Sequence, residues 1–574
     1  METRPLRRHP VAAVLGWALA AAAPFAFLAV FFAYPVLTVV TDGLSSLGDV
    51  LGRSAIRGVM WFTVWQAVAS TALTLAVGIP AAAALARLRP RTRRIVRAVI
   101  TVPFVLPTVV VAGAFEAVFD RFGLDGGTLS LHHTVWAILL AHVFFNYAVV
   151  VRTVGSWWAG LDGRNADAAA VLGATPVRAF RHVTWPLLRP AVAASAAVTF
   201  LFSFTSFGVI LILGGPARAT VETEIYRYAI TRLDFATASA LALCQLVAVA
   251  ALVALAGVAE RRRAVARRAP GRMAPRRRHS VIAVNAIVAV VLLGVPIITL
   301  VERSFATGGG YGVANFVALA DRVQMLPTTA LAALRHSLVF AVLATAIATA
   351  IGALASAVVV GGRPASSRRS PALGMGPLPP DTARRGWPRG GSNRTRGTAW
   401  LRRLFDVGLT LPLGVSAVTV GLGMLLALDT PPLEFRTVWW IIPVAHALVG
   451  MPFVVRTLVP TLRSIDDRLR EAASVLGASP LRTRREVDVP IASRAVAVGA
   501  AFAFAVSLGE FGATAFLPRR PDTLTAPLAL FRLLGTPGET LQGQAMALAV
   551  VLMAATAASV LVIEGLRRTD ESLF

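Results

Sequence analysis

The sequence predicts an all-α polytopic membrane protein, with about twelve transmembrane helices arranged as two parallel six-helix repeats. Three observations support this fold class. Hydrophobic residues make up 56% of the 574 positions and charged residues only 15%, with a mean hydropathy of +0.69, whereas soluble domains carry about 25% charged residues. The hydrophobic residues are gathered in long runs. A polar segment between two such runs recurs 304 positions later in the same order.

The apolar runs are long enough for membrane helices, since a helical span needs about 20 mainly apolar residues. The expected spans are 14–40, 60–86, 95–119, 134–155, 188–213 and 236–258, then 281–302, 336–360, 404–428, 437–459, 491–517 and 544–566. The first run follows a basic N-terminus, as a signal peptide does. It is much longer than the roughly 7–15 residues of a signal-peptide core, so we expect an uncleaved first helix.

The formal net charge of +27 comes from arginine, because the sequence contains no lysine. The arginines lie in short clusters between alternate apolar runs, as at 87–94 and 261–268. This distribution is typical of cytoplasmic loops in membrane proteins and not of a nucleic-acid-binding surface. We therefore expect a protein of the cytoplasmic (inner) membrane that contacts the lipid bilayer, has both termini in the cytoplasm and binds no nucleic acid.

Two features of the composition exclude classes of chemistry. A phosphate-binding P-loop needs a lysine, and this chain has none. Cys244 is the single cysteine, so neither an internal disulfide nor a cysteine-based metal site can form. We expect this chain to have no catalytic residues, to bind no metal or cofactor, and not to be an enzyme.

The duplication extends through both halves of the chain. Identical residues stand 304 positions apart at His142 and His446, Arg152 and Arg456, and Phe207 and Phe511. Two parallel halves imply a pseudo-two-fold axis along the membrane normal with a pathway between them. The predicted organisation is a first transmembrane domain at 1–258, a basic cytoplasmic linker at 259–280 and a second domain at 281–574. The Gly-, Pro-, Ser- and Arg-rich stretch 361–400 inside the second domain is expected to be a disordered cytoplasmic insertion.

The duplicated polar segment predicts a helix, a turn and a second helix. The copies read DAAAVLGATPVRAFRHVTWP at 167–186 and EAASVLGASPLRTRREVDVP at 471–490. In the second copy Gly477 is suited to end the first helix in a left-handed conformation. Ser479 then suits the cap of the second helix, with Pro480 in its first turn. Small alanine side chains would let a partner groove approach this segment closely.

This loop resembles the cytoplasmic loop of permease subunits of binding-protein-dependent ABC importers. The resemblance covers nearly the whole chain except 361–400, and it implies the type I permease fold. It also implies that two copies of an ATPase subunit, which carry the ATP, dock on the loops, and that an extracytoplasmic solute-binding protein delivers the substrate. The family motif falls on Glu471, Ala472, Ala473, Gly477 and Pro490 in the second copy and on Asp167, Ala168, Ala169, Gly173 and Pro186 in the first, where Asp replaces Glu.

Fusion of two permease halves in one chain is similar to the thiamine and ferric-iron permeases. The stretch FTSFGVILILGGPARATVETEIYRYAITRLDFATASALALCQLV, which begins at Phe204, resembles the thiamine group. SLGEFGATAFLPRRPDTLTAPLALFRLLG, from Ser507, resembles that group and, more distantly, the sulfate and molybdate permeases. The resemblance therefore favours transport of thiamine or its phosphates, with ferric iron as the alternative.

Polar residues inside the expected spans are candidates for the substrate pathway, because such residues are costly in a membrane and often functional. Glu510 would suit a cationic substrate, unless it pairs with an arginine or lies near the outer interface. The other candidates, for which interhelical hydrogen bonding or packing is the alternative, are His142, His446, Asn146 and Ser206. In the outward loops, possible contacts for a binding protein are Glu222, Glu224, Asp522 and Glu539.

An ion-driven secondary transporter is the rival from another class. Twelve spans in parallel halves would suit it equally well. It does not predict the duplicated alanine-rich loop, and it would be expected to have more carboxylates within the spans. A membrane scaffold or receptor would need a soluble domain that this sequence does not contain.

Overall fold

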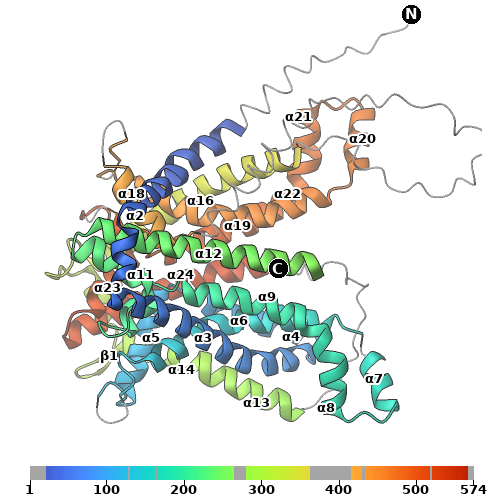
Figure 1. Cartoon of the computed structure of the whole chain (residues 1–574), viewed down its shortest axis with the longest axis horizontal. Coiled ribbons are helices and arrows are strands. Elements are labelled where there is room, and N and C mark those ends of the chain that lie inside the picture. Colours follow the sequence, from blue (N-terminus) through green and yellow to red (C-terminus); the bar gives the residue numbers. More distant parts are fainter. Residues whose placement is uncertain are drawn as a thin grey trace, which may run out of the picture.

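The computed structural model describes residues 21–126, 130–162, 164–263, 279–361, 415–429, 433–435, 437–517 and 520–566. Over these residues the protein is a bundle of helices that run mostly along its long axis (Figure 1). Ten helices are long and apolar enough to cross a membrane, or eleven if one bent pair counts as a span. The expected all-α polytopic fold is therefore confirmed.

The first half opens with the span Ala21–Gly52, which includes η1 (Ala29–Ala33) and α2 (Tyr34–Gly52). Its further helices are α3 (Ser54–Ala86), α4 (Pro90–Val105), α5 (Thr108–Arg121), α6 (Val135–Ala159), α7 (Arg164–Val171), α8 (Pro176–Ala179), η2 (Phe180–Thr184), α9 (Trp185–Phe204), α10 (Gly208–Leu213), α11 (Val221–Tyr226), η3 (Arg227–Thr231) and α12 (Phe235–Arg263).

The second half repeats this order with an added hairpin after α14, in which β1 (Ala306–Thr307) pairs antiparallel with β2 (Gly310–Tyr311). Its helices are α13 (His279–Ala289), η5 (Val290–Gly294), α14 (Val295–Phe305), α15 (Ala314–Val317), η6 (Ala318–Ala320), α16 (Ala330–Gly361), α18 (Ala417–Ala427), α19 (Ile441–Ser464), α20 (Asp467–Val475), α21 (Pro480–Thr483), η11 (Arg484–Asp488), α22 (Val489–Gly509), η12 (Thr514–Phe516), α23 (Ala526–Leu534) and α24 (Glu539–Leu566).

Equivalent helices make equivalent contacts in the two halves. In the first half α3, α6 and α9 pack on one another, and in the second α16, α19 and α22 do the same. The first long helix of each half crosses over to the other half, so that α2 packs on α18 and α14 packs on α5. One hydrophobic core lies where the two halves meet, which we call the junction, and contains residues of both halves. The halves therefore interlock as pseudo-symmetric units.

Several expected spans differ from the helices observed. The expected helix 95–119 is two helices, α4 and α5, that meet at 95°. The bend falls at Leu106 and Pro107, where the backbone is extended, because a residue before proline is disfavoured in helical geometry. The expected helices 188–213 and 491–517 end earlier, at Phe204 and Gly509. Each is followed by a short break and another short helix.

Three expectations fall wholly or partly on residues that the structure does not describe. Of the ninth expected span, 404–428, only the part from residue 415 on is described, and it contains α18. Of the linker 259–280, residues 264–278 lie outside the described part. The same holds for 362–400 of the expected insertion. The prediction of disorder there stays a prediction.

Candidate functional site

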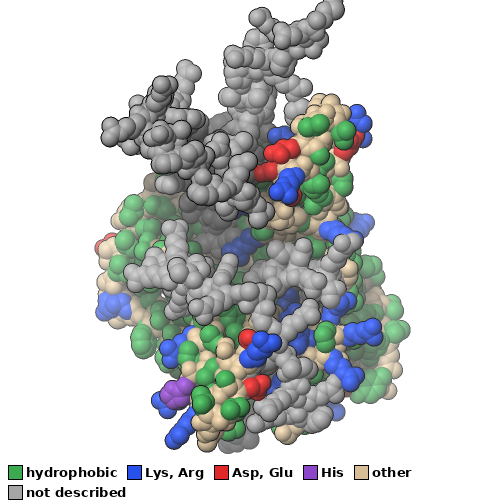
Figure 2. Space-filling view, turned by 90° about the vertical axis from the view of Figure 1, so that its right-hand side faces the viewer, with side chains coloured by type: hydrophobic (Ala, Val, Ile, Leu, Met, Phe, Trp, Pro, Cys, Tyr) green, Lys and Arg blue, Asp and Glu red, His purple; other side chains and the backbone are tan. Residues whose placement is uncertain are grey.

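Both duplicated loops lie at one end of the bundle (Figure 1). We call this end, formed by α7, α8, α20 and α21, the loop face, and the end that carries α11, α18, α23 and β1 the opposite face. Figure 2 views the loop face directly and shows hydrophobic side chains at its surface beside arginine and acidic side chains. The two loops project from it at well-separated places.

The first helix of each loop begins at an equivalent aspartate. The Asp162 carboxylate accepts a hydrogen bond from the backbone N–H of Arg164 at 3.0 Å, and that of Asp466 accepts one from Arg468 N–H at 3.0 Å. A carboxylate at this position satisfies a backbone donor that the helix leaves unpaired and favours the positive end of its dipole. The start of the loop is thus fixed by local chemistry in both copies.

Equivalent glycines end these helices, as the sequence predicts. Gly173 has φ of 81° and Gly477 has φ of 82°, both in the left-handed region. The next residue closes the helix end, since Ala174 N–H donates to Ala169 C=O and Ala478 N–H donates to Ala473 C=O, each at 2.9 Å. This is the Schellman arrangement, which favours glycine because a Cβ is strained there.

The second helix of each loop starts at the predicted cap and runs on into the next span. Thr175 accepts from Arg178 N–H at 3.4 Å and Ser479 accepts from Arg482 N–H at 3.3 Å. A π-helical turn, η2 or η11, then precedes the first turn of α9 or α22, which contains Pro186 or Pro490. A wide turn suits a proline that cannot donate a backbone hydrogen bond. A movement of the loop can therefore pass directly into α9 or α22.

The loops present an equivalent set of side chains to solvent. Asp167, Ala168, Glu471 and Ala472 are exposed, while Ala169 and Ala473 are half-buried. The sequence analysis did not identify the most exposed apolar side chains of the loops. These are 75–87% exposed in both copies: Val171, Leu172 and Val177 in the first, and Val475, Leu476 and Leu481 in the second. We call these six residues the apolar triads. Their signal was present in the sequence, because an apolar pair stands before the glycine of both polar loops.

The two loops are braced by different interactions. In the second loop the Arg470 guanidinium joins Asp467 on its own helix to Asp488 on η11, with both N–O distances at 2.9 Å. In the first loop aromatic rings join η2 to α6 and α9. Phe180 stacks on Trp158 at 5.9 Å between ring centroids and contacts Trp185 at 6.2 Å. The backbone is preserved in both copies, although the bracing is not.

Among the pathway candidates, Glu510 and His446 form one buried network in the second half. The Glu510 carboxylate accepts hydrogen bonds from Ala513 N–H at 2.8 Å, Thr514 N–H at 3.0 Å and the Thr514 hydroxyl at 2.6 Å. The His446 Nε2 atom lies 3.3 Å from it, and the Nδ1 atom lies 2.8 Å from the Ser507 hydroxyl. Glu510 lies just after α22, not inside a span, and its carboxylate caps the short turn that follows.

The equivalent network in the first half has no acid. His142 Nδ1 lies 2.9 Å from the Ser70 hydroxyl, and the Asn146 amide donates to His142 C=O at 3.0 Å. Ser206 occupies the position of Glu510 and is buried. The interhelical hydrogen bond expected as an alternative for each histidine is confirmed. A role in the substrate pathway stays a prediction for all five candidates.

The expected binding-protein contacts are only partly at the surface. Glu222 and Glu224 are 0% and 9% exposed, so the prediction that these two acids lie on an outward surface is wrong. They lie on α11, which packs against α12 and contacts α18 of the second half. Asp522 and Glu539 are exposed.

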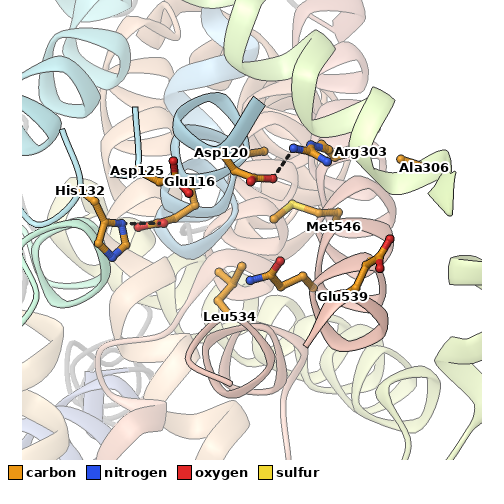
Figure 3. A pocket seen from close by; sticks show the side chains of 12 residues that line it. Glu116, Asp120, Asp125, His132, Arg303, Ala306, Leu534, Glu539 and Met546 are labelled. Carbon is orange, nitrogen blue, oxygen red and sulfur yellow. Dashed lines mark hydrogen bonds and ion pairs between the residues drawn. The ribbon is translucent and has the colours of Figure 1, made fainter. Parts of the chain in front are cut away.

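A cavity of about 310 Å³ opens near the opposite face between the two halves (Figure 3). Glu116 and Asp120 of α5 line one side, where Glu116 pairs with His132 at 3.1 Å and Asp120 pairs with Arg303 of α14. Glu539 of α24 lies on another side. Within the part of the chain that the structure describes, no group of three His, Cys, Asp or Glu residues is arranged to hold a metal ion.

Comparison with known proteins identifies the family. The family model described as "Binding-protein-dependent transport system inner membrane component" matches twice, at residues 74–265 and 391–568. The thiamine transport system permease protein of Brucella abortus is 26% identical over 97% of this chain and 98% of its own length. The Escherichia coli protein of the same description is 26% identical over 83% of both chains.

A second group of relatives matches one part of the chain. The molybdenum transport system permease protein of Mycobacterium tuberculosis is 38% identical over 203 residues, which is 34% of this chain and 75% of that protein. The two family matches agree with the duplicated loops and with the interlocked halves described above. The chain belongs to the family of inner membrane components of binding-protein-dependent transport systems, with two copies of the family unit in one polypeptide.

Proposed function

We propose that this permease carries thiamine or its phosphates from an extracytoplasmic binding protein into the cytoplasm, driven by two separate ATPase subunits. The observation that carries the proposal is the pair of equivalent loops, each with three exposed apolar side chains at its tip. Exposed apolar groups at equivalent places on one face are typical of a docking surface. The choice of thiamine is supported by relatives that match nearly the full chain and bear that name.

In this proposal each loop enters a groove on one ATPase subunit. The apolar triads, of which Leu172 and Leu476 are the most exposed leucines, would be buried there, and the helix-in-groove mode explains the need for small alanine side chains beside them. Because α8 and α21 continue into α9 and α22, closure of the ATPase pair would move these spans. For ATP binding to drive transport, the ATP-bound ATPase pair must bind one of two states of the permease more tightly than the other.

The orientation belongs to the same proposal. The arginine-rich ends of the helices lie on the loop face with the two loops (Figure 2). The rule that positive residues stay on the cytoplasmic side supports a cytoplasmic loop face, with both termini there and the chain in the inner membrane. The opposite face would then receive the binding protein, with exposed Asp522 and Glu539 as candidate contacts. Glu510, His142, His446, Asn146 and Ser206 are retained as proposed pathway residues.

Transport measurements separate this function from its alternatives. The permease, reconstituted in liposomes with its ATPase and binding protein, should accumulate radiolabelled thiamine only when ATP is supplied on the loop-face side. Uptake of ferric iron or molybdate without thiamine uptake would reject the proposed substrate. Uptake by the chain alone under an ion gradient would reject the ATP-driven mechanism and favour a secondary transporter.

A further inference from the structure

Two equivalent phenylalanines meet where the halves join near the opposite face. Phe207 follows the break after α9, and Phe511 follows α22 at the equivalent position. Their rings stack with centroids 5.2 Å apart and planes 23° apart, and the side chains are only 6% and 3% exposed. Each half therefore contributes one ring to a single contact, which can open only if the halves separate.

Three more rings surround this pair. Tyr226 of α11 lies 5.5 Å from Phe207 and 5.8 Å from Phe516, while Phe531 lies 5.4 Å from Phe511. We call these five residues the junction rings. The first half supplies two of them and the second half three, so the cluster forms a continuous aromatic surface across the junction. A flat aromatic ligand would find stacking partners of suitable geometry here when the halves move apart.

Glu222 stands one helical turn before Tyr226, so both side chains project from one face of α11. It is fully buried, and its Oε1 atom accepts a hydrogen bond from the Gln245 amide of α12. Its other oxygen, Oε2, accepts no hydrogen bond within the described residues, and Ser416 of the second half lies nearby. Burial raises the pKa of Glu222 to about 7, against the opposing effect of these polar neighbours.

A second acceptor beside Glu222 also lacks a donor. Gln245 is 3% exposed, and its Oε1 atom has no hydrogen-bond partner among the described residues. Two buried oxygen acceptors on neighbouring helices, α11 and α12, thus have no partner at hydrogen-bond geometry among the described residues, and the Ser416 hydroxyl is the one donor that acts on the Glu222 carboxylate besides Gln245. Buried groups of this kind are normally satisfied, and a carboxylate needs a positive charge or a donor to offset the cost of leaving water.

Glu224, the other acid of the same helix, is neutralised by an ion pair, as buried carboxylates usually are. Glu224 pairs with Arg227 at 2.9 Å, whereas no arginine or histidine is paired with Glu222 in the described part of the chain. The second half has no such acid, because Ala526 stands at the equivalent position. Glu222 is therefore an acid without an ion-pair partner on one side of the aromatic cluster, whereas Glu510, which precedes Phe511, is paired with His446.

We propose that Glu222 and Gln245, with the junction rings, form the transit site of the permease for an aromatic organic cation that carries N–H donors. The inference rests on the proposed function and deepens it, because thiamine has a thiazolium cation and an aminopyrimidine. The thiazolium charge faces the Glu222 carboxylate, the amino group donates to the acceptors, and the aromatic faces stack on the junction rings. An inorganic oxyanion without a cationic ring, such as molybdate, is repelled by the same carboxylate.

Variants of Glu222 in the complete reconstituted transporter test this site. Thiamine uptake and the ATPase activity stimulated by the thiamine-loaded binding protein are measured for the wild type, E222Q and E222D. E224Q is the matched control, since Glu224 lies on the same helix and already has its arginine partner. Uptake is normalised to the amount of assembled complex, so that poor insertion is not mistaken for poor transport.

We expect E222Q to lower thiamine uptake about tenfold or more, because a buried cation then faces no counter-charge. Stimulated ATPase activity should persist, E222D should fall between, and E224Q should match the wild type. Wild-type uptake in E222Q, or equal loss of uptake and ATPase stimulation in both E222Q and E222D, would overturn the site while leaving thiamine transport intact.

Two further results cover the remaining possibilities. If E222Q does not assemble, F511L decides, since it keeps an apolar side chain but removes one stacking ring; unchanged thiamine uptake in F511L would then overturn the site. If the wild type carries molybdate and no thiamine, the proposed function fails, and the cation site fails with it.

Discussion

Replacing Gly477 by proline should uncouple ATP hydrolysis from transport. Gly477 has φ of 82°, which proline cannot adopt because its ring fixes φ near about −65°. The substitution also removes the N–H that donates to Ser474 C=O at 3.0 Å. The helix can therefore not end in the observed turn, and the apolar side chains beside it lose their arrangement.

The free-energy cost of replacing Gly477 can be bounded from below by a milder substitution, Gly477→Ala. A Cβ at Gly477 would meet no atom within 4 Å, so Gly477→Ala costs only the backbone strain of about 1–2 kcal/mol. A cost of that size changes the ratio of native to alternative turns by about 5- to 30-fold. Gly477→Pro must cost more, since it forbids the conformation and also removes a hydrogen bond.

The assay is thiamine-stimulated ATPase activity and uptake by the reconstituted complex. We expect activity to fall in the order wild type, G477A, G477P, with insertion and the first-half loop unchanged. G477N is the matched control, because asparagine tolerates the left-handed conformation, and it should stay near the wild type. Normal stimulated activity in an inserted G477P complex would refute the role of this turn in coupling.

Three further predictions concern bracing, packing and capping. Arg470→Ala should lower stimulated ATPase activity more than Arg482→Ala. Arg470 joins α20 to η11, whereas the Arg482–Glu486 pair lies within one exposed helical turn and is screened by solvent. Gly43→Ala should lower the melting temperature of the purified chain by the equivalent of about 1–3 kcal/mol, since the added Cβ would lie 2.6 Å from the backbone oxygen of Ser239. Glu510→Gln should cost about 1–3 kcal/mol in the same measurement, because its NH2 group would replace one of the two oxygens that accept from Ala513 N–H and Thr514 N–H and would face a backbone donor.

Each of these has a control in the same chain. Gly48 lies on the same helix as Gly43 and faces open space, so G48A should be neutral or slightly stabilising; equal losses in both would contradict close packing of α2 on α12. Asp522 is an exposed acid, and D522N should not change the melting temperature. A stable E510Q would remove the capping role of Glu510. Equal ATPase activity in R470A and R482A would show that the Arg470 bridge does not support coupling.

Local chemistry explains why the loops could be predicted from the sequence. A helix that ends at glycine and restarts at a capping serine or threonine depends on residues within one or two turns of one another. Because equivalent residues stand 304 positions apart, the structure predicted for one copy could be assigned to the other. Gly173 and Gly477 accordingly have nearly the same φ.

The end of α22 and the burial of Glu222 depend on tertiary contacts, which a hydropathy pattern cannot predict. The run 491–517 is mainly apolar and continues so on both sides of Glu510, so its hydropathy does not indicate that the helix ends at Gly509. Glu222 lies between apolar runs and was expected at the surface, but the second half covers α11 from the other side of the junction. An acid of this kind can be recognised as buried only after the halves are assembled.

The proposed function requires each loop of this chain to hold one ATPase subunit. Native mass spectrometry of the purified complex tests it directly, using L172D and L476D to place a charge in each apolar triad. We expect two ATPase subunits on the wild-type chain, one on either single variant and none on the double variant. Two subunits retained on the double variant would contradict it.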